Sequence, residues 1–146
     1  MAKSLPDKWV RKAVYNAIDN IVVDDSVIKC YDTRVTSANG YTPDRYVLMT
    51  TQTNVVGERT KCEYVYESSI LLDIVLTYDR PGNTGSRLEV DNIAEAVRSQ
   101  LENLTLDVSS GLSIVRQTQN FPNDQVTVTD NEIITEKFIR LELTIQ

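Results

Sequence analysis

Histidine is absent from this chain of 146 residues, and cysteine occurs only twice, as Cys30 and Cys62. Without histidine the chain lacks both the commonest general base and the commonest metal ligand. The cysteines do not form a C-x-x-C pair, and we expect two reduced thiols rather than a disulfide. Cys30 falls in a strand-like segment, where a small buried apolar residue is the simplest interpretation. We therefore expect no catalytic residue, no metal site and no cofactor, and the sequence gives no positive evidence of an enzyme.

Long apolar runs are also missing. None approaches the ~20 residues that span a bilayer, and the opening M-A-K-S-L-P-D-K lacks the apolar segment of a signal peptide. We expect a protein that has no contact with a membrane and is assembled in a cytoplasm. The length predicts a single domain over residues 1–146. The hydrophobic share of 41% and the charged share of 25% are ordinary for a globular protein.

Positive charge is in the minority, with a net charge of −6 and a sequence pI near 4.6. Proteins that bind nucleic acid by neutralising its phosphates have basic surfaces, so a dedicated reader of DNA or RNA is not expected. An acidic surface still suits a passage through which nucleic acid slides without sticking. The basic residues cluster early, at Lys3, Lys8, Arg11 and Lys12. We favour a solvated helix face for this cluster, with a docking patch for an acidic partner as the alternative.

The stretch 63–78, E-Y-V-Y-E-S-S-I-L-L-D-I-V-L-T-Y, dominates the middle of the chain. Its even positions, from Tyr64 to Tyr78, are almost wholly apolar or aromatic, and its odd positions are mixed. This alternation is typical of a half-buried strand. Strands are usually about 5–6 residues long, so we expect this one to project past the body of its sheet. Asp73 is a lone charge on its mixed face, where a solvent or interface position explains it without catalysis.

A turn at residues 79–86, D-R-P-G-N-T-G-S, ends this strand. Two glycines between a strand and a helix are typical of phosphate-binding turns, but neither the G-x-G-x-x-G nor the G-x-x-x-x-G-K-[ST] pattern is present. A helix is predicted over residues 88–104, with Ser86 and Glu89 at capping-box spacing. Its expected apolar stripe consists of Leu88, Ile93, Ala94, Val97, Leu101 and Leu104.

The remaining elements follow from the same periodicities. A first amphipathic helix is predicted at 6–22, strands at 27–33, 45–56, 112–118, 126–129 and 138–145, and loops at 37–44 and 119–125. The order is α-β-β-β-α-β-(β)-β. The prediction is an α+β fold: a mostly antiparallel sheet with an extended hairpin, and two main helices packed on one face.

The hairpin formed by 45–56 and 63–78 is the main functional clue. Its polar, aromatic-tipped part, 51–67, is either a long edge ribbon or an arm that packs on a neighbouring subunit. We favour the arm, because exposed strand edges invite pairing. The candidate subunit-interface residues are Tyr64, Tyr66, Glu67, Asp73 and Arg80.

The order of these elements and the character of their sequences also resemble those of a known family. The segments are V-Y-N-A-I in the first helix, R-Y-V-L-M and S-I-L-L-D-I-V-L-T-Y-D in the long strands, the turn D-R-P-G-N-T-G-S, the helix N-I-A-E-A-V-R-S-Q-L-E-N-L and the closing strand K-F-I-R-L-E-L-T-I. In this arrangement the chain resembles the tail-completion, or tail-terminator, proteins of long-tailed bacteriophages. The likeness covers most of the chain. The loop at 119–131 is longer and more polar than the family's pattern.

The resemblance implies a non-enzymatic subunit of a ring, commonly hexameric, that caps the finished tail tube and joins it to the head–neck connector. The implied partners are further copies of the chain, the tail-tube protein and a neck protein, and the implied location is the virion. DNA would only pass through the lumen, without sequence-specific binding. The alternatives are a neck stopper or a tail-tube subunit and, from another class, a small cytoplasmic enzyme or anion-binding domain using the turn 79–86.

Overall fold

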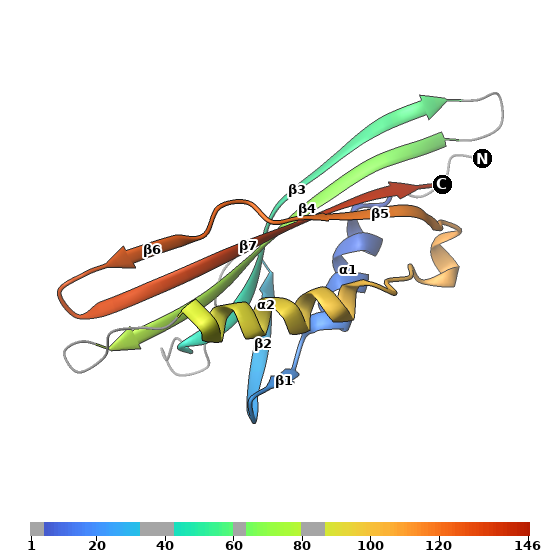
Figure 1. Ribbon diagram of the computed structural model, residues 1–146. Coiled ribbons are helices and arrows are strands. Elements are labelled where there is room, and N and C mark those ends of the chain that lie inside the picture. Colours follow the sequence, from blue (N-terminus) through green and yellow to red (C-terminus); the bar gives the residue numbers. More distant parts are fainter. Residues whose placement is uncertain (1–4, 33–42, 60–63, 80–86) are drawn as a thin grey trace.

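The computed structural model describes residues 5–32, 43–59, 64–79 and 87–146, and Figure 1 draws the rest in grey. The described part of the chain contains two α-helices, one short 3₁₀ helix and seven strands. In chain order they are α1 (Asp7–Ile18), β1 (Ile21–Val23), β2 (Ser26–Asp32), β3 (Arg45–Arg59), β4 (Tyr64–Asp79), α2 (Arg87–Leu101), η1 (Val108–Ser110), β5 (Ile114–Asn120), β6 (Gln125–Val128) and β7 (Glu132–Ile145). The predicted α+β class is confirmed, and β1 is an addition to the predicted order.

All seven described strands belong to one sheet, in the spatial order β1-β2-β3-β4-β7-β5, with β6 also paired to β7. β2 and β3 are parallel and the other described pairs are antiparallel, which confirms the mostly antiparallel sheet. β7 is paired with β4 along its whole length. Its other edge is shared by β6, opposite Ile133 to Glu136, and β5, opposite Arg140 to Ile145. Figure 1 shows β5 and β6 following one another along β7.

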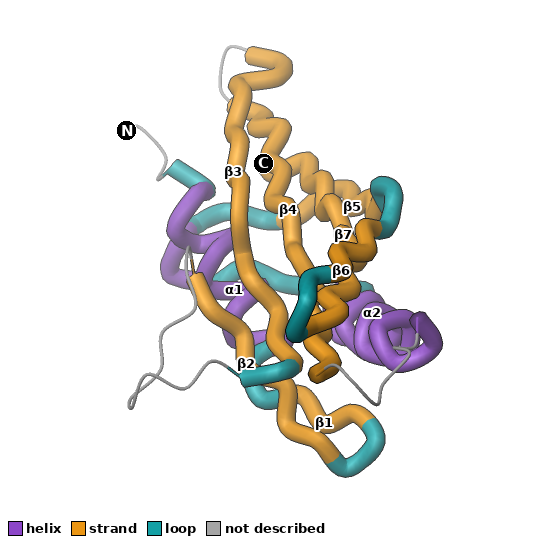
Figure 2. Tube along the Cα trace, turned by 90° about the vertical axis from the view of Figure 1, so that its left-hand side faces the viewer, coloured by secondary structure: helices purple, strands orange, loops and turns teal. Residues whose placement is uncertain are grey.

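Both helices lie on the same face of the sheet, which we call the inner face (Figure 1). α1 packs against β2 and β3, and α2 packs against β4 and β7, as the turned view in Figure 2 also shows. On β4 the alternate residues from Tyr66 to Leu76 are buried on the inner face. The core is formed by Val10, Val14, Ile18, Ile28, Val47, Ile70, Leu72, Ile74, Leu76, Val90, Ile93, Val97, Leu101, Ile139, Leu141 and Leu143.

The first helix was predicted to run to residue 22, and this is wrong. It ends at Ile18, because Asp19 is extended and donates its amide to the Tyr15 carbonyl at 2.8 Å. Residues 21–23 then form β1, which pairs with β2 through a turn at Asp24 and Asp25. Both turn residues have positive φ (49° and 65°), the conformation of a two-residue type I′ hairpin. These two carboxylates are therefore turn residues.

The predicted stripe of the second helix needs one correction. Leu88 is 68% exposed, and Val90 occupies the core in its place. Helical geometry puts Val90 on the same side as Ile93, Val97 and Leu101 and leaves Leu88 on the opposite side. Leu104 lies beyond the helix end and still packs into the core.

The last strand begins earlier than predicted, at Glu132 rather than near residue 138. The polar side chains of residues 135–137 obscured its alternation. Thr135 donates a hydrogen bond to the Leu76 carbonyl on the inner face, and Lys137 forms ion pairs with Asp91 (2.9 Å) and Asp124 (3.5 Å). The predicted loop 119–125 shrinks accordingly to residues 121–124, between β5 and β6.

The core assignment predicts different costs for two leucine truncations. Leu72 is fully buried on β4, so Leu72→Ala should lower the free energy of unfolding by about 2–5 kcal/mol. Leu88→Ala removes the same atoms from an exposed position and should stay within about 0.5 kcal/mol of the unsubstituted protein. Urea denaturation followed by circular dichroism measures both, and equal losses in the two variants would contradict this core.

Candidate assembly surfaces

The β3–β4 hairpin extends past the end of β7, at the upper right of Figure 1. β3 and β4 have 15 and 16 residues, so the prediction of an unusually long strand pair is confirmed. Ile145 at the end of β7 pairs with Tyr66, so the neighbouring strand supports β4 from Tyr66 onward. Val55 and Val56 on β3 are 63% and 50% exposed. The projecting arm is therefore shorter than the predicted 51–67, because part of that segment belongs to the sheet body.

The structure spreads the candidate interface residues rather than gathering them. Tyr66 is 5% exposed and belongs to the core, so it has almost no surface to offer a neighbour. Glu67 is exposed on the opposite, outer face and accepts a hydrogen bond from the Thr144 hydroxyl at 3.0 Å. Asp73 shares that face about 20 Å further along the strand. The Tyr64 side chain and Arg80 lie outside the described residues, and the interface role of the set stays a prediction.

The middle of the outer face mixes apolar side chains with three charged ones, Asp73, Glu136 and Arg140. Neither described helix covers it. On this face Asp73 of β4 lies between Leu48 of β3 and Phe138 of β7. Two residues further along β4, Val75 pairs with Tyr46 of β3. The Tyr46 ring meets the Tyr31 ring of β2 edge to face, with centroids 5.9 Å apart. We call the set Tyr46, Leu48, Leu71, Ile134 and Phe138, all half-buried, the outer patch.

An acid pair lies within the outer patch. Asp73 of β4 is diagonal to Glu136 of β7, which pairs with Val75. Burial, then the hydrogen bond and the charge of Glu136, raise the pKa of Asp73 from 3.8 to about 8. Burial, and then the charges of these two carboxyls, raise the pKa of Tyr46 on the neighbouring strand. No lysine or arginine among the described residues forms an ion pair with either carboxyl.

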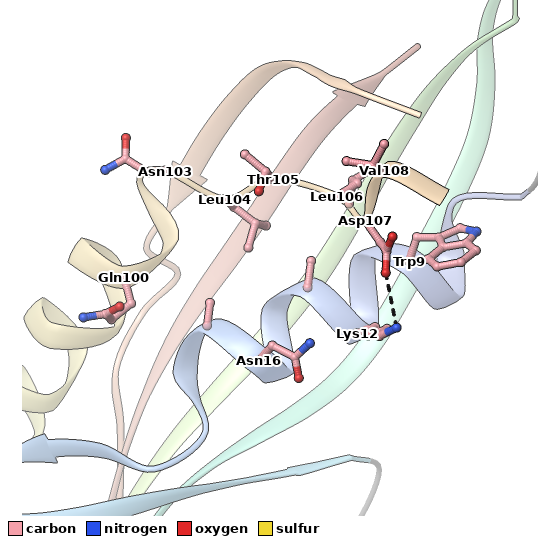
Figure 3. Close-up of a pocket in the computed structure, with 12 residues that line it drawn as sticks. Trp9, Lys12, Asn16, Gln100, Asn103, Leu104, Thr105, Leu106, Asp107 and Val108 are labelled. Carbon is pink, nitrogen blue, oxygen red and sulfur yellow. Dashed lines mark hydrogen bonds and ion pairs between the residues drawn. The ribbon is translucent and has the colours of Figure 1, made fainter. Parts of the chain in front are cut away.

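A second surface lies on the exposed side of α1. A groove of about 440 Å³ lies between this helix and the segment that leads from α2 to η1. Figure 3 shows the residues that line it. At one end Lys12 bonds Asp107 at 3.4 Å, beside the Trp9 ring. Bonds from Ser109, helped by Lys12, lower the pKa of Asp107. Val108 on the groove's wall is 93% exposed.

Two members of the basic cluster predicted at the start of the chain, Lys8 and Lys12, lie beside this tryptophan, and Lys3 lies outside the described residues. The ammonium groups of Lys8 and Lys12 lie 4.7 and 5.7 Å from the centre of the Trp9 ring, within cation–π range. Arg11 turns toward the sheet instead, where it donates a hydrogen bond to Gln52 (2.8 Å) and forms an ion pair with Asp32 (3.7 Å) beside a cavity of about 620 Å³. We call Lys8, Trp9 and Lys12 the α1 cation face. The helical spacing of Lys8 and Lys12 was the signal for it, and Trp9 itself is half-buried against the core.

The described residues carry little of the equipment of an enzyme. Burial, with smaller contributions from Asp19 and Asp32, raises the pKa of Cys30 to about 12, so its thiol is a poor nucleophile. The interpretation of Cys30 as a small buried residue is confirmed by its 3% exposure. Cys62 and turn residues 80–86 are not among the described residues. Within the described ranges no cluster of carboxylates and thiols could hold a metal ion, and no helix has the length and apolarity to cross a membrane.

Comparison with known proteins gives one kind of match. No protein-family model and no curated protein sequence matches the chain. Sixteen chains of solved structures match it. One belongs to a structure of the virion of a native gene transfer agent (GTA) particle, with 12% sequence identity and a TM-score of 0.60. The match covers 94% of this chain and 96% of that chain, so the two share their fold over nearly their whole lengths.

The acid pair predicts a pH dependence of stability. Because the pKa of Asp73 is raised to about 8 on folding, the folded chain holds a proton that the unfolded chain has lost. The free energy of unfolding should therefore fall as pH rises from about 4 to about 8. Asp73 is only half-buried and water screens part of the cost, so we expect a fall of about 1–2 kcal/mol.

Asp73→Asn should abolish this fall, and the variant should be more stable than the unsubstituted protein near pH 8. Urea denaturation at about pH 5 and pH 8 measures the effect. Asp107→Asn is the control with the opposite sign, because folding lowers the pKa of Asp107. Its substitution should give no gain in stability near pH 8. A gain from Asp107→Asn, or none from Asp73→Asn, would contradict the assignment.

Proposed function

We propose that this protein is a structural component of a phage-like virion and, within that class, a ring-forming tail terminator. The observation that carries the proposal is the fold shared with a chain of the GTA virion, which extends over 94% of this chain and 96% of that one. Because the match covers nearly all of both chains, it indicates that the two share the fold of a whole subunit and not only a local motif. The resemblance of the sequence to tail-terminator proteins supports the same class.

We propose that such a protein acts through its contact surfaces with other proteins and not through a catalytic site. A subunit that forms a ring needs one surface that meets the next copy and another that meets the tail tube or the neck. This chain offers three candidates: the projecting β3–β4 hairpin, the outer patch on the sheet, and the α1 cation face. They lie at different sides of the molecule, so one subunit can hold several neighbours at once.

The acidic character of the chain fits a ring around a DNA passage. A net charge of −6 repels phosphates, so DNA would pass through the lumen without being held by it. The proposed partners are therefore proteins: further copies of the chain in a ring, the tail-tube protein below and a neck protein above. We propose no substrate, no cofactor and no membrane contact.

The test is assembly with a purified tail tube. We expect the protein to form rings that bind tube ends, seen by negative-stain electron microscopy and counted by mass photometry. Self-polymerisation into tubes would identify a tube subunit instead, and binding to the portal complex would identify a neck stopper. A particle that stays monomeric at high concentration and binds neither tubes nor portals would overturn the virion proposal.

The projecting hairpin should matter for this assembly. Val55→Asp with Val56→Asp places charges on exposed positions of β3 at the base of the arm, opposite Glu67 and Tyr66 of β4, so folding should be preserved while ring formation weakens by about tenfold, or ~1.4 kcal/mol. Val22→Asp is the matched control, because Val22 is 65% exposed on another hairpin. Mass photometry over a concentration series compares the variants. Equal weakening by the control would mean that charge alone, and not the arm, is responsible.

A further inference from the structure

The outer face of the sheet has the composition of a buried layer. An antiparallel sheet with one face in solvent normally places polar side chains there. In this chain the hairpin end of the outer face follows that rule, with Thr53, Ser69 and Glu142. The middle departs from it, because the outer patch of Tyr46, Leu48, Leu71, Ile134 and Phe138 is aromatic and aliphatic, with the exposed Arg140 beside Leu71 at its border. Apolar patches of this kind mark protein–protein contacts.

The charge within the outer patch specifies what a partner must present. Asp73 and Glu136 put two carboxyls among apolar side chains, and Oδ1 of Asp73 is buried with no hydrogen-bond partner among the described residues. Near neutral pH the pair keeps one proton, and a cation supplied by a partner would stabilise its remaining negative charge. A complementary partner therefore needs an apolar or aromatic group flanked by lysine or arginine.

The same chain carries such a surface. On the α1 cation face the ammonium groups of Lys8 and Lys12 lie 4.7 and 5.7 Å from the centre of the Trp9 ring, which is half-buried and packs against the core. Lys12 is already bonded to Asp107, whereas Lys8 forms no ion pair with any described residue. Tryptophan is one of the residues enriched among the energetic centres of interfaces.

We propose that the outer patch of one copy receives the α1 cation face of the next copy, with Lys8 directed at the Asp73–Glu136 pair. α1 packs on the inner face of the sheet, so its exposed side and the outer patch lie on opposite sides of the subunit. A contact between two different patches is heterologous, and repetition of it closes a ring if the rotation allows. This inference rests on the proposed ring and names the contact that builds it.

The direct test is cross-linking between copies. A chain with Lys8→Cys and Glu136→Cys, with Cys62→Ser to limit background, is treated with a short bismaleimide at a protein concentration that supports assembly. The two positions lie on opposite sides of the sheet, so they cannot be bridged within one subunit. We expect a ladder of covalent oligomers on a denaturing gel that ends at the ring number. The control has Thr53→Cys in place of Glu136→Cys. Its cysteine is still on the outer face but outside the outer patch, so it should give at least tenfold less cross-linked product.

A charge exchange tests the same contact without cysteines. Lys8→Glu should weaken assembly by about tenfold, and Lys8→Glu combined with Glu136→Lys should restore it. Arg87→Glu is the matched control, since Arg87 is an exposed cation at the start of α2. An equal effect of Arg87→Glu, or no rescue by the double variant, would overturn the proposed contact.

The outcomes separate this inference from the proposed function. Rings on tail tubes without a ladder would overturn the contact and leave the function standing. A ladder from a protein that binds no tube, portal or neck component would support the contact and overturn the function. Absence of both rings and ladder would overturn both.

Discussion

The central constraint of this fold is that β4 is paired on both sides and buried on one face. β3 and β7 flank it over most of its 16 residues, and the helices cover its alternate residues from Tyr66 to Leu76. A slip of one residue in its register would turn Leu72 and Ile74 outward and Asp73 inward. Such a slip would bury a carboxyl in the core, so the register is firmly specified. Because the alternate residues of β4 fill the inner face, Leu71, Asp73 and Val75 must lie on the outer face, where Leu71 is part of the outer patch.

The sequence predicted those elements whose periodicity is long and uninterrupted. The strand at 63–78 and the start of the first helix were placed within a residue or two for this reason. The helix end was misplaced because Ile21 continues the apolar spacing, and only Asp19 and Asn20, with extended and left-handed backbones, break the helix. The first half of β7 was missed because Lys137 is a polar inner-face residue, paired with Asp91 and Asp124 from segments distant in sequence.

The surfaces were predictable only in part. Asp73 was singled out because a lone charge in an apolar strand is visible in sequence, but its neighbour Glu136 depends on the register between β4 and β7. Tyr66 was chosen for its aromatic ring, although strand alternation already placed it with the core residues Ile70 and Leu72. The α1 cation face needed only helical spacing. What sequence cannot supply is the relation between surfaces: the sheet must form before the outer patch and α1 are seen to lie on opposite sides.

The pairing of β3 with β4 is irregular along the long hairpin, and this affects how β3 can pair with other strands. β3 shifts register twice against β4, between Met49 and Gln52 and again between Val56 and Arg59. Bulges bend a strand and interrupt its row of hydrogen-bonding groups, and an interrupted edge is a poor template for indiscriminate strand addition. The row of hydrogen-bonding groups along β3 is therefore broken at two places, which limits the length of any strand that could pair with it in register.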